Sequence, residues 1–319
     1  MNKEFRKQLT IDLATVVIGY LVLGLLIRSG VINAYSKGIL LMVCINVILT
    51  VSLNITSGFL GELALGHAGF MAIGAYVSAL FTKSLNLIPL VEFPVAILLG
   101  GIAALIAGYI VSIPALRLRG DYLAIITLAA GEIIRNLLKN LDIVGGTKGY
   151  TGIPNYTSFT WAYLIAVICI LASKSLIASR HGRAIISIRE DEIAAEASGI
   201  DTNRYKIIGF VFSAFFAGVG GALYAHYLRF LQPGIFTLDK SIEILVMVVL
   251  GGMGSIRGSV ISATILTVLP ELLRGFSDYR MLVYSLVLIL MMLAKHNDQL
   301  RALFDKALSS FRRKEAAHE

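Results

Sequence analysis

Four long uncharged runs constrain this chain more than any other feature of its sequence. Residues 38–61, 93–116, 149–173 and 207–228 form runs of 22 to 25 residues without Asp, Glu, Lys or Arg. A helix of about 20 apolar residues crosses the hydrocarbon core of a bilayer. Charged residues make up only 15% of the chain, too few for a soluble domain or a disordered one. The sequence therefore predicts an all-α polytopic membrane protein.

Six weaker apolar segments raise the expected number of crossings to about ten. They cover residues 10–27, 67–83, 122–140, 242–255, 258–274 and 279–295. With the N-terminus inside, 18 Lys and Arg fall on the side of the two termini and nine on the other side. This bias predicts that both termini are cytoplasmic. We expect one transmembrane domain over residues 1–319, with a cytoplasmic loop at about 176–206 and a cytoplasmic tail at about 296–319.

Several chemistries have no sequence motif in this chain. There is no G-x-x-x-x-G-K-[ST] phosphate loop, no H-E-x-x-H and no C-x-x-C. We therefore expect no catalytic residue, no metal site and no cofactor in the chain itself. The energy for any transport must come from an ion gradient or from a separate subunit.

Two glycine clusters, at residues 58–69 and 250–259, interrupt the apolar segments. Interrupted helices free backbone groups, which is tolerated where the backbone is buried in protein or lines a cavity, and such segments often border the route of a transporter. The candidates for a translocation path or hinge are Gly61, Glu62, Gly66, His67, Gly69, Gly252 and Gly254. Two alternatives stay open: close helix packing for the glycines, and a water-exposed turn for Glu62 and His67.

Two further patterns predict helix contacts. Glu132 and Arg135 lie three positions apart, so on a helix they share one face and can form an ion pair. Ala214, Gly218 and Ala222 form a stripe of small residues that permits close helix contact. We expect this stripe to help the chain pair with a similar permease.

The loop before the fourth uncharged run contains a predicted short helix at residues 190–198. The segment has no Pro or Gly, acidic residues lie in its first turn, and Gly199 follows as a stop. Ile193, Ala197 and Ile200 form a small apolar stripe. Such a helix suits a groove on another protein. A helix lying on the membrane surface is the alternative, but its polar face would usually be rich in Lys and Arg.

Four stretches of the chain carry a family likeness. They are GFLGELALGHAGF at 58–70, LRGDYLAIITL at 118–128, GGTKGYTGIP at 145–154 and IREDEIAAEASGI at 188–200. In this order they resemble the permeases of ABC importers, specifically the M-type (LivM type) subunit of branched-chain amino acid transporters. The second and third stretches are similar to the M-type subunit rather than to its H-type partner.

The fourth stretch resembles the loop that couples such permeases to their ATPases, whose pattern is Glu-Ala-Ala, three residues, then Gly. Ala194, Ala195 and Gly199 fit this pattern, whereas Ile193 stands in the Glu position and Glu192 precedes it. The resemblance implies that the ATPase-coupling loop includes Arg189, Glu190, Asp191, Glu192, Ala194, Ala195 and Gly199.

The resemblance also implies partners and a substrate. They are an H-type permease subunit, two cytoplasmic ATPases that bind ATP and Mg²⁺, and an extracytoplasmic binding protein. The substrates would be Leu, Ile and Val, carried across a prokaryotic cytoplasmic membrane; some relatives move other amino acids, amides or urea. An ion-coupled secondary carrier is the alternative, with Glu62 and Glu132 as its only candidate carboxylates. A membrane scaffold without transport is a further class, and no extra domain favours it.

Overall fold

The computed structural model describes residues 33–84, 88–115 and 120–273, together with Gly24, Ser285, Leu286 and Ile289. The chain divides into two compact units, Met1–Thr264 and Ile265–Glu319. Most of the predicted spans at 10–27 and 279–295, and the whole tail at 296–319, lie outside the described residues. The fold described below is that of the first unit, which contains every candidate site residue.

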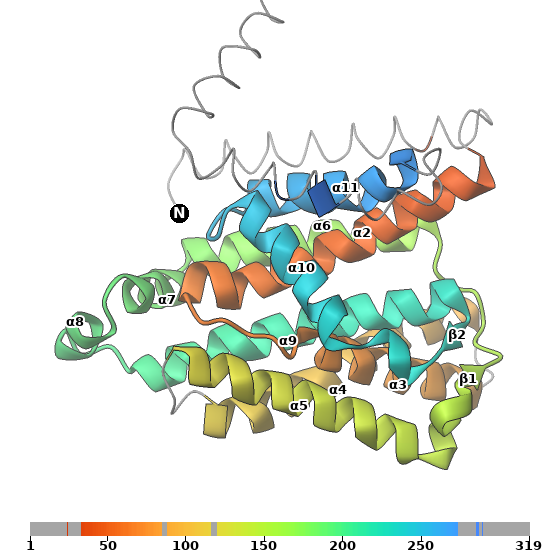
Figure 1. Ribbon diagram of the computed structural model, residues 1–319, viewed down its shortest axis with the longest axis horizontal. Helices are drawn as coiled ribbons and strands as arrows, with labels where there is room; N and C mark the ends of the chain where they lie inside the picture. The colour runs from red at the N-terminus through yellow and green to blue at the C-terminus, as the bar shows by residue number, and fades with distance from the viewer. Residues whose placement is uncertain are drawn as a thin grey trace, which may run out of the picture. The chain divides into compact units, whose positions relative to one another are not determined.

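The described part of the first unit is almost entirely helical (Figure 1). Its elements in chain order are α2 (Ala34–Asn54), η1 (Ile55–Leu60), α3 (His67–Ser84), α4 (Pro89–Ala115), α5 (Asp121–Asn140), η2 (Asp142–Val144), η3 (Gly146–Lys148), β1 (Tyr150–Thr151), α6 (Phe159–Ala178), α7 (Arg180–Glu190), α8 (Glu192–Ala197), α9 (Thr202–Leu228), β2 (Phe230–Leu231), η4 (Pro233–Ile235), α10 (Leu238–Gly251) and the start of α11 (Ile256–Leu272).

Four of these helical segments are long and apolar enough to cross a membrane. They are Ala34–Leu60, Pro89–Ala115, Phe159–Ala178 and Thr202–Leu228, and each contains most of one uncharged run of the sequence. This confirms the prediction of an α-helical membrane protein. The number of about ten crossings stays a prediction.

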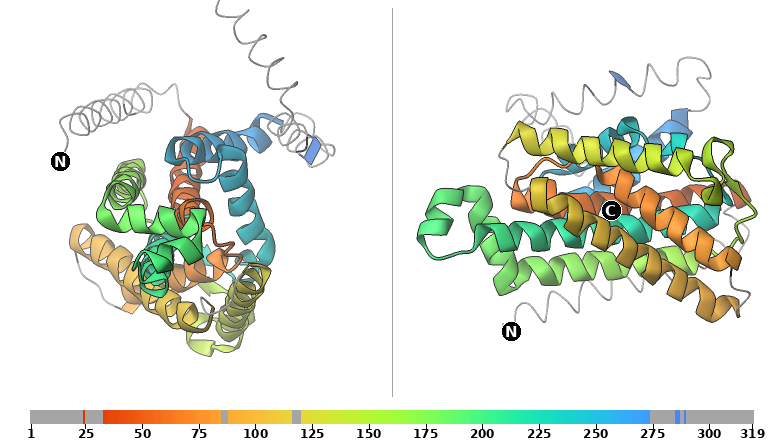
Figure 2. Two further views of the ribbon diagram at one scale, coloured as in Figure 1. Left: turned by 90° about the vertical axis from the view of Figure 1, so that its left-hand side faces the viewer. Right: turned by 90° about the horizontal axis from the view of Figure 1, so that it is seen from below.

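Helix α9 lies at the centre of the unit and packs against α2, α3 and α4. Figure 2 shows the long helices roughly end-on in its left view, with α9 among them. Glycines allow close approaches there: a Cβ on Gly218 would lie 2.7 Å from the carbonyl oxygen of Gly100, and a Cβ on Gly100 would lie 2.7 Å from that of Gly74. Small residues thus allow three helices to pack backbone against backbone.

This packing corrects one expectation from the sequence. Ala214 and Ala222 are 1% and 0% exposed, and Gly218 lies between them against α3 and α4. The small-residue stripe permits close contact, as expected, but that contact is made within this chain. The prediction that the stripe meets a second permease is therefore wrong.

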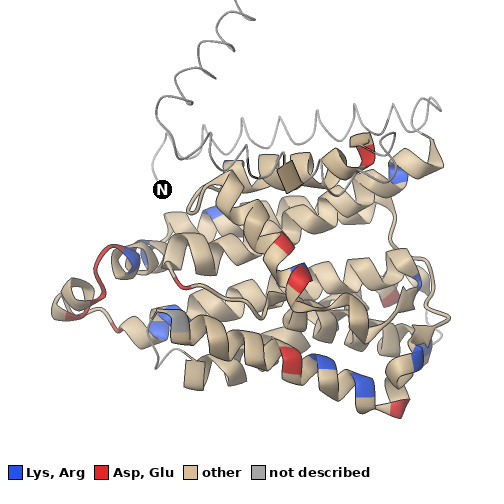
Figure 3. Cartoon of the chain, viewed as in Figure 1, with Lys and Arg blue, Asp and Glu red and all other residues tan. Residues whose placement is uncertain are grey.

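The two ends of the unit differ in character. At one end, α7 and α8 project from the long helices; at the other, β1 and β2 form a short antiparallel pair with Tyr150 opposite Leu231 (Figure 1). Charged residues gather around α7, α8 and the start of α9, and along α5, whereas α4 and most of α6 and α9 are nearly free of charge (Figure 3). The candidate loop thus lies among charged residues, at the end of the unit opposite β1 and β2 (Figure 1 and Figure 3).

Candidate functional site

The first glycine cluster forms a real break between two helices. Helix α2 continues into η1, the chain is non-helical from Gly61 to Gly66, and α3 begins at His67. Gly61 takes the left-handed conformation with φ +81°, which a residue with a Cβ adopts at a cost. We call Gly61–Gly66 the first break.

Side chains from other helices bind the backbone N–H groups at this break. The Leu65 N–H donates to the Thr127 hydroxyl on α5 at 3.0 Å, and the Ala68 N–H donates to the Ser241 hydroxyl on α10 at 3.1 Å. A buried N–H without an acceptor is costly, so these hydroxyls make the interruption tolerable. The first break is held by contacts with α5 and α10.

The second glycine cluster forms a comparable break at Gly252–Ser255, between α10 and α11, which we call the second break. The side chain of Asn54, at the end of α2, binds the second break and the first turn of α11. Its Oδ1 accepts from the Gly254 N–H at 2.9 Å, and its Nδ2 donates to the Ser255 carbonyl at 3.1 Å and to the Ser259 hydroxyl at 2.9 Å. Asn54 is fully buried, so all three bonds form away from water.

Arg189, at the end of α7, lies against both breaks. Its Nη1 donates to the Gly58 carbonyl, just before the first break, at 2.9 Å. A Cβ on Gly61 would lie 3.0 Å from Arg189 Cγ, and a Cβ on Gly254 would lie 2.7 Å from Arg189 Nη1. The absence of side chains at these two glycines therefore makes room for the arginine.

The loop contains two helices where the sequence predicted one. Helix α7 ends at Glu190, Asp191 is extended, and α8 begins at Glu192. The Asp191 carboxylate accepts from the N–H groups of Ile193 and Ala194 at 2.9 and 3.0 Å. Aspartate is a strong N-cap because it pairs these free donors, so the predicted helix begins at Glu192, two residues after its expected start at residue 190.

Helix α8 is a small exposed projection. Ala195 is buried, whereas Ile193 is 70% exposed and Ala194, Glu196 and Ala197 are also exposed. Gly199 ends the helix with φ +83°, and its N–H donates to the Glu196 carbonyl at 2.9 Å, which confirms the predicted stop. The apolar side chain of Ile193 has little packing within this chain.

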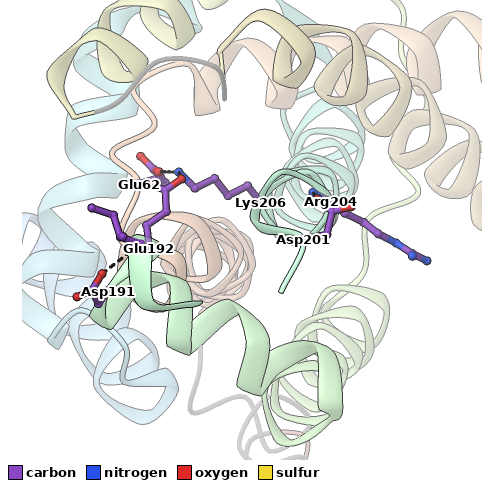
Figure 4. Close-up of polar contacts among 7 residues, drawn as sticks. Glu62, Asp191, Glu192, Asp201, Arg204 and Lys206 are labelled. Carbon is purple, nitrogen blue, oxygen red and sulfur yellow. Dashed lines mark hydrogen bonds and ion pairs between the residues drawn. The ribbon is translucent and has the colours of Figure 1, made fainter. Parts of the chain in front are cut away.

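Lys206, on the second turn of α9, connects α8 to the first break (Figure 4). Its Nζ lies 2.6 Å from Glu62 Oε1 and 3.0 Å from Glu192 Oε1. The lysine is 1% exposed, while the side chains of Glu62 and Glu192 are 13% and 26% exposed. A buried ammonium requires such partners, because an unpaired charge in this position is strongly unfavourable.

The other candidates from the first cluster are buried in helix contacts. His67 is 2% exposed and its Nε2 lies 3.1 Å from the Ser52 hydroxyl, so the alternative of a water-exposed turn is wrong for this residue. A Cβ on Gly66 would overlap the Thr127 carbonyl oxygen, and one on Gly69 would lie 2.8 Å from the Gly131 Cα. At Gly66 and Gly69 the structure favours close packing against α5.

The predicted ion pair on α5 is present. Arg135 Nε donates to Glu132 Oε2 at 2.9 Å, and the two side chains are 22% and 31% exposed, respectively. Beside it, a small crevice between α3, α5 and α10 is lined by Leu65, Ala68, Gly69, Leu128, Gly131, Glu132, Phe236, Thr237, Leu238 and Ser241.

The structure thus brings Gly61, Glu62 and Gly254 together with Arg189 and Glu192 at one junction. Gly66, the last residue of the first break, and His67 and Gly69, in the first turn of α3, lie elsewhere. Sequence reasoning missed Asn54 and Lys206. Asn54 is a polar residue within an uncharged run and Lys206 directly precedes another, and each position could have indicated that a buried partner was needed.

Comparison with known proteins shows a consistent set of relatives. Residues 35–294 match the family described as branched-chain amino acid transport system / permease component. The chain is 37% identical to the high-affinity branched-chain amino acid transport system permease protein LivM of Salmonella typhimurium, over 81% of this chain and 68% of that protein. It is 37% identical to LivM of Escherichia coli K12, over 78% of this chain and 66% of that protein.

These relatives are longer than this chain, which spans about two thirds of their length. The permease protein LivH of Salmonella typhimurium is 24% identical, over 77% of this chain and 88% of that protein. The higher identity to LivM agrees with the M-type features of the sequence. No solved structure matches the chain.

Proposed function

The chain belongs to the family of branched-chain amino acid transport permease components, and on this premise we propose that it is a transmembrane subunit of an ATP-driven importer of Leu, Ile and Val. It would lie in a prokaryotic cytoplasmic membrane with about ten crossings, two re-entrant or interrupted segments, and both termini inside. Its partners would be an H-type permease, two ATPases and an external binding protein. Similarity to both LivM and LivH supports the second permease.

The observation that carries this proposal is the junction at the end of the unit from which α7 and α8 project. A short exposed helix, α8, lies one residue after α7, whose last turn carries Arg189 against both breaks. An ATPase that pushes on α8 would therefore act close to the interrupted segments. The exposed side chain of Ile193 gives α8 an apolar anchor for such a partner.

The chain itself would supply positioning and a path rather than chemistry. It has no phosphate-binding loop, so we expect ATP and Mg²⁺ to be bound by the ATPases alone. The ion-coupled carrier is less well supported, because both carboxylates on which it depends are in ion pairs: Glu62 with Lys206 and Glu132 with Arg135. A proton or cation path would need such groups to be available.

Uptake by proteoliposomes tests the proposal directly. The chain is reconstituted with its candidate H-type permease, ATPases and binding protein, and accumulation of radiolabelled leucine is measured with ATP or a non-hydrolysable analogue at the ATPases. We expect uptake only with ATP and all subunits. The chain reconstituted alone is the control, and ATP-independent uptake by it would restore the ion-coupled carrier. ATP-driven uptake of another amino acid, an amide or urea, but not of leucine, would revise the substrate alone.

A further inference from the structure

Lys206 is the one described lysine of the first unit that is both fully buried and bound to two carboxylates from different elements. Glu62 belongs to the first break and Glu192 is the first residue of α8. Figure 4 shows Lys206 extending from α9 toward Glu62 and Glu192, while Arg204, two positions earlier, points away. The residue thus lies between the exposed loop and the interrupted segment.

We propose that Lys206 is a positioning residue for transport, which keeps α8 and the first break in a fixed relation so that a displacement of α8 displaces Glu62. The inference rests on the proposed function. It assigns the transmission of movement to a specific contact, between one ammonium group and two carboxylates, rather than to the loop as a whole.

The physical argument is the cost of separating these charges. Lys206 lies away from water, so it cannot exchange a carboxylate for solvent without exposing itself or leaving a buried charge unpaired. If α8 moves and carries Glu192 with it, Lys206 must follow or lose that partner. Glu62 is bound to the same nitrogen at 2.6 Å, so it is drawn along. The two contacts therefore change together.

Arg189 cannot replace this contact. It reaches the same region through the Gly58 carbonyl, and its side chain is 39% exposed, so water can substitute when the bond breaks. The hydrogen bond between Arg189 and the Gly58 carbonyl therefore breaks at a lower cost than the ion pairs of Lys206. Lys206 has no such alternative partner in water.

The decisive variant removes all three charges at once. Glu62→Gln/Lys206→Met/Glu192→Gln leaves no unpaired ion, and replacing a whole buried ion cluster is often neutral for stability. The complete complex is assembled with each variant, and leucine taken up per ATP hydrolysed is measured. We expect the triple variant to assemble and hydrolyse ATP with this ratio at least about tenfold below that of the unmodified complex, within the usual range of coupling effects. Lys206→Arg, which retains the charge, should recover part of the ratio.

Arg204→Met is the matched control, since it also removes one positive charge from the start of α9, at an exposed position. It should leave the ratio unchanged. An unmodified ratio in the assembled triple variant would overturn the inference, and so would failure of that variant to assemble, because Lys206 would then have a purely structural role. Absence of ATP-driven uptake by the unmodified complex would overturn the proposed function itself.

Discussion

At the scale of single residues, the site depends on glycines that have no room for a side chain and on polar groups that have no access to water. Gly254 leaves space for the Arg189 guanidinium, and Asn54 binds three groups of the second break and α11. Gly199 differs from these, because nothing lies within 4 Å of where its Cβ would be. Glycine is favoured at position 199 only because the backbone there takes the left-handed conformation.

Gly199→Val therefore tests the end of α8 without a packing clash. The left-handed conformation at φ +83° costs a non-glycine residue roughly 1–2 kcal/mol, and a β-branched one more. We expect the complex to insert and assemble but to lose most of its leucine uptake, because α8 ends differently. Gly234→Val is the control, since Gly234 also has open space and is not in the left-handed region. Normal uptake with normal ATPase binding in Gly199→Val would contradict this role.

At the scale of elements, the two breaks are the features that position the site. The glycine clusters at residues 58–69 and 250–259 predicted their existence, because each glycine lowers the local helix propensity and several lie close together there. Which groups would bind the freed backbone could not be predicted. Thr127, Ser241 and Asn54 come from distant parts of the chain, and only the packing of α2, α5 and α10 brings them to the breaks.

In the loop that contains α7 and α8, the sequence likewise predicted the presence of a helix but not the contact that starts it. The sequence predicted a helix ending at Gly199, and both the helix and its end are present. It did not predict that Asp191 would cap a separate α8, because residues 189–198 as a whole favour helix. The Asp191 carboxylate instead binds the backbone N–H groups of Ile193 and Ala194, a local bond that competes with continuation of α7.

Gly66→Leu tests whether the first break is held by packing. A side chain there would overlap the Thr127 carbonyl oxygen, which is backbone and cannot rotate away. Overpacking in a core costs about 1–3 kcal/mol when side chains can adjust, so we expect at least this loss. The measurement is the amount of folded subunit extracted in detergent and its thermal midpoint, with Gly234→Leu as the control. An unchanged midpoint with lost uptake would instead favour a direct role in the path.

At the scale of the whole molecule, α5 presents an unusual surface. Its exposed residues include Tyr122, Ile125, Ile133 and Leu137, yet the Glu132–Arg135 pair beside them is only partly covered. Charged groups at membrane depth rarely face lipid. We therefore expect this face of α5, rather than the fully apolar exposed face of α4, to meet a second permease or the water between the two.

Cysteine crosslinking distinguishes these faces. Ile133→Cys on α5 should crosslink to a set of cysteines on the partner permease, whereas Ile106→Cys on α4, which is similarly exposed, should not. Both native cysteines are free and buried, so background reaction should be low. Crosslinking at Ile106 and none at Ile133 would place the partner on the opposite face and contradict the expectation.

The length of α9 and the place where it is held have a mechanical consequence. With 27 residues at 1.5 Å each, α9 is roughly 40 Å long, about the thickness of a bilayer with its headgroups. Lys206 lies near one end, β2 follows the other, and Gly218 near the middle is in backbone contact with α3 and α4. This crossing is therefore the point about which we expect α9 to tilt if Lys206 is displaced. A tilt about it moves the two ends in opposite directions, so opening one face of the membrane and closing the other can be a single event.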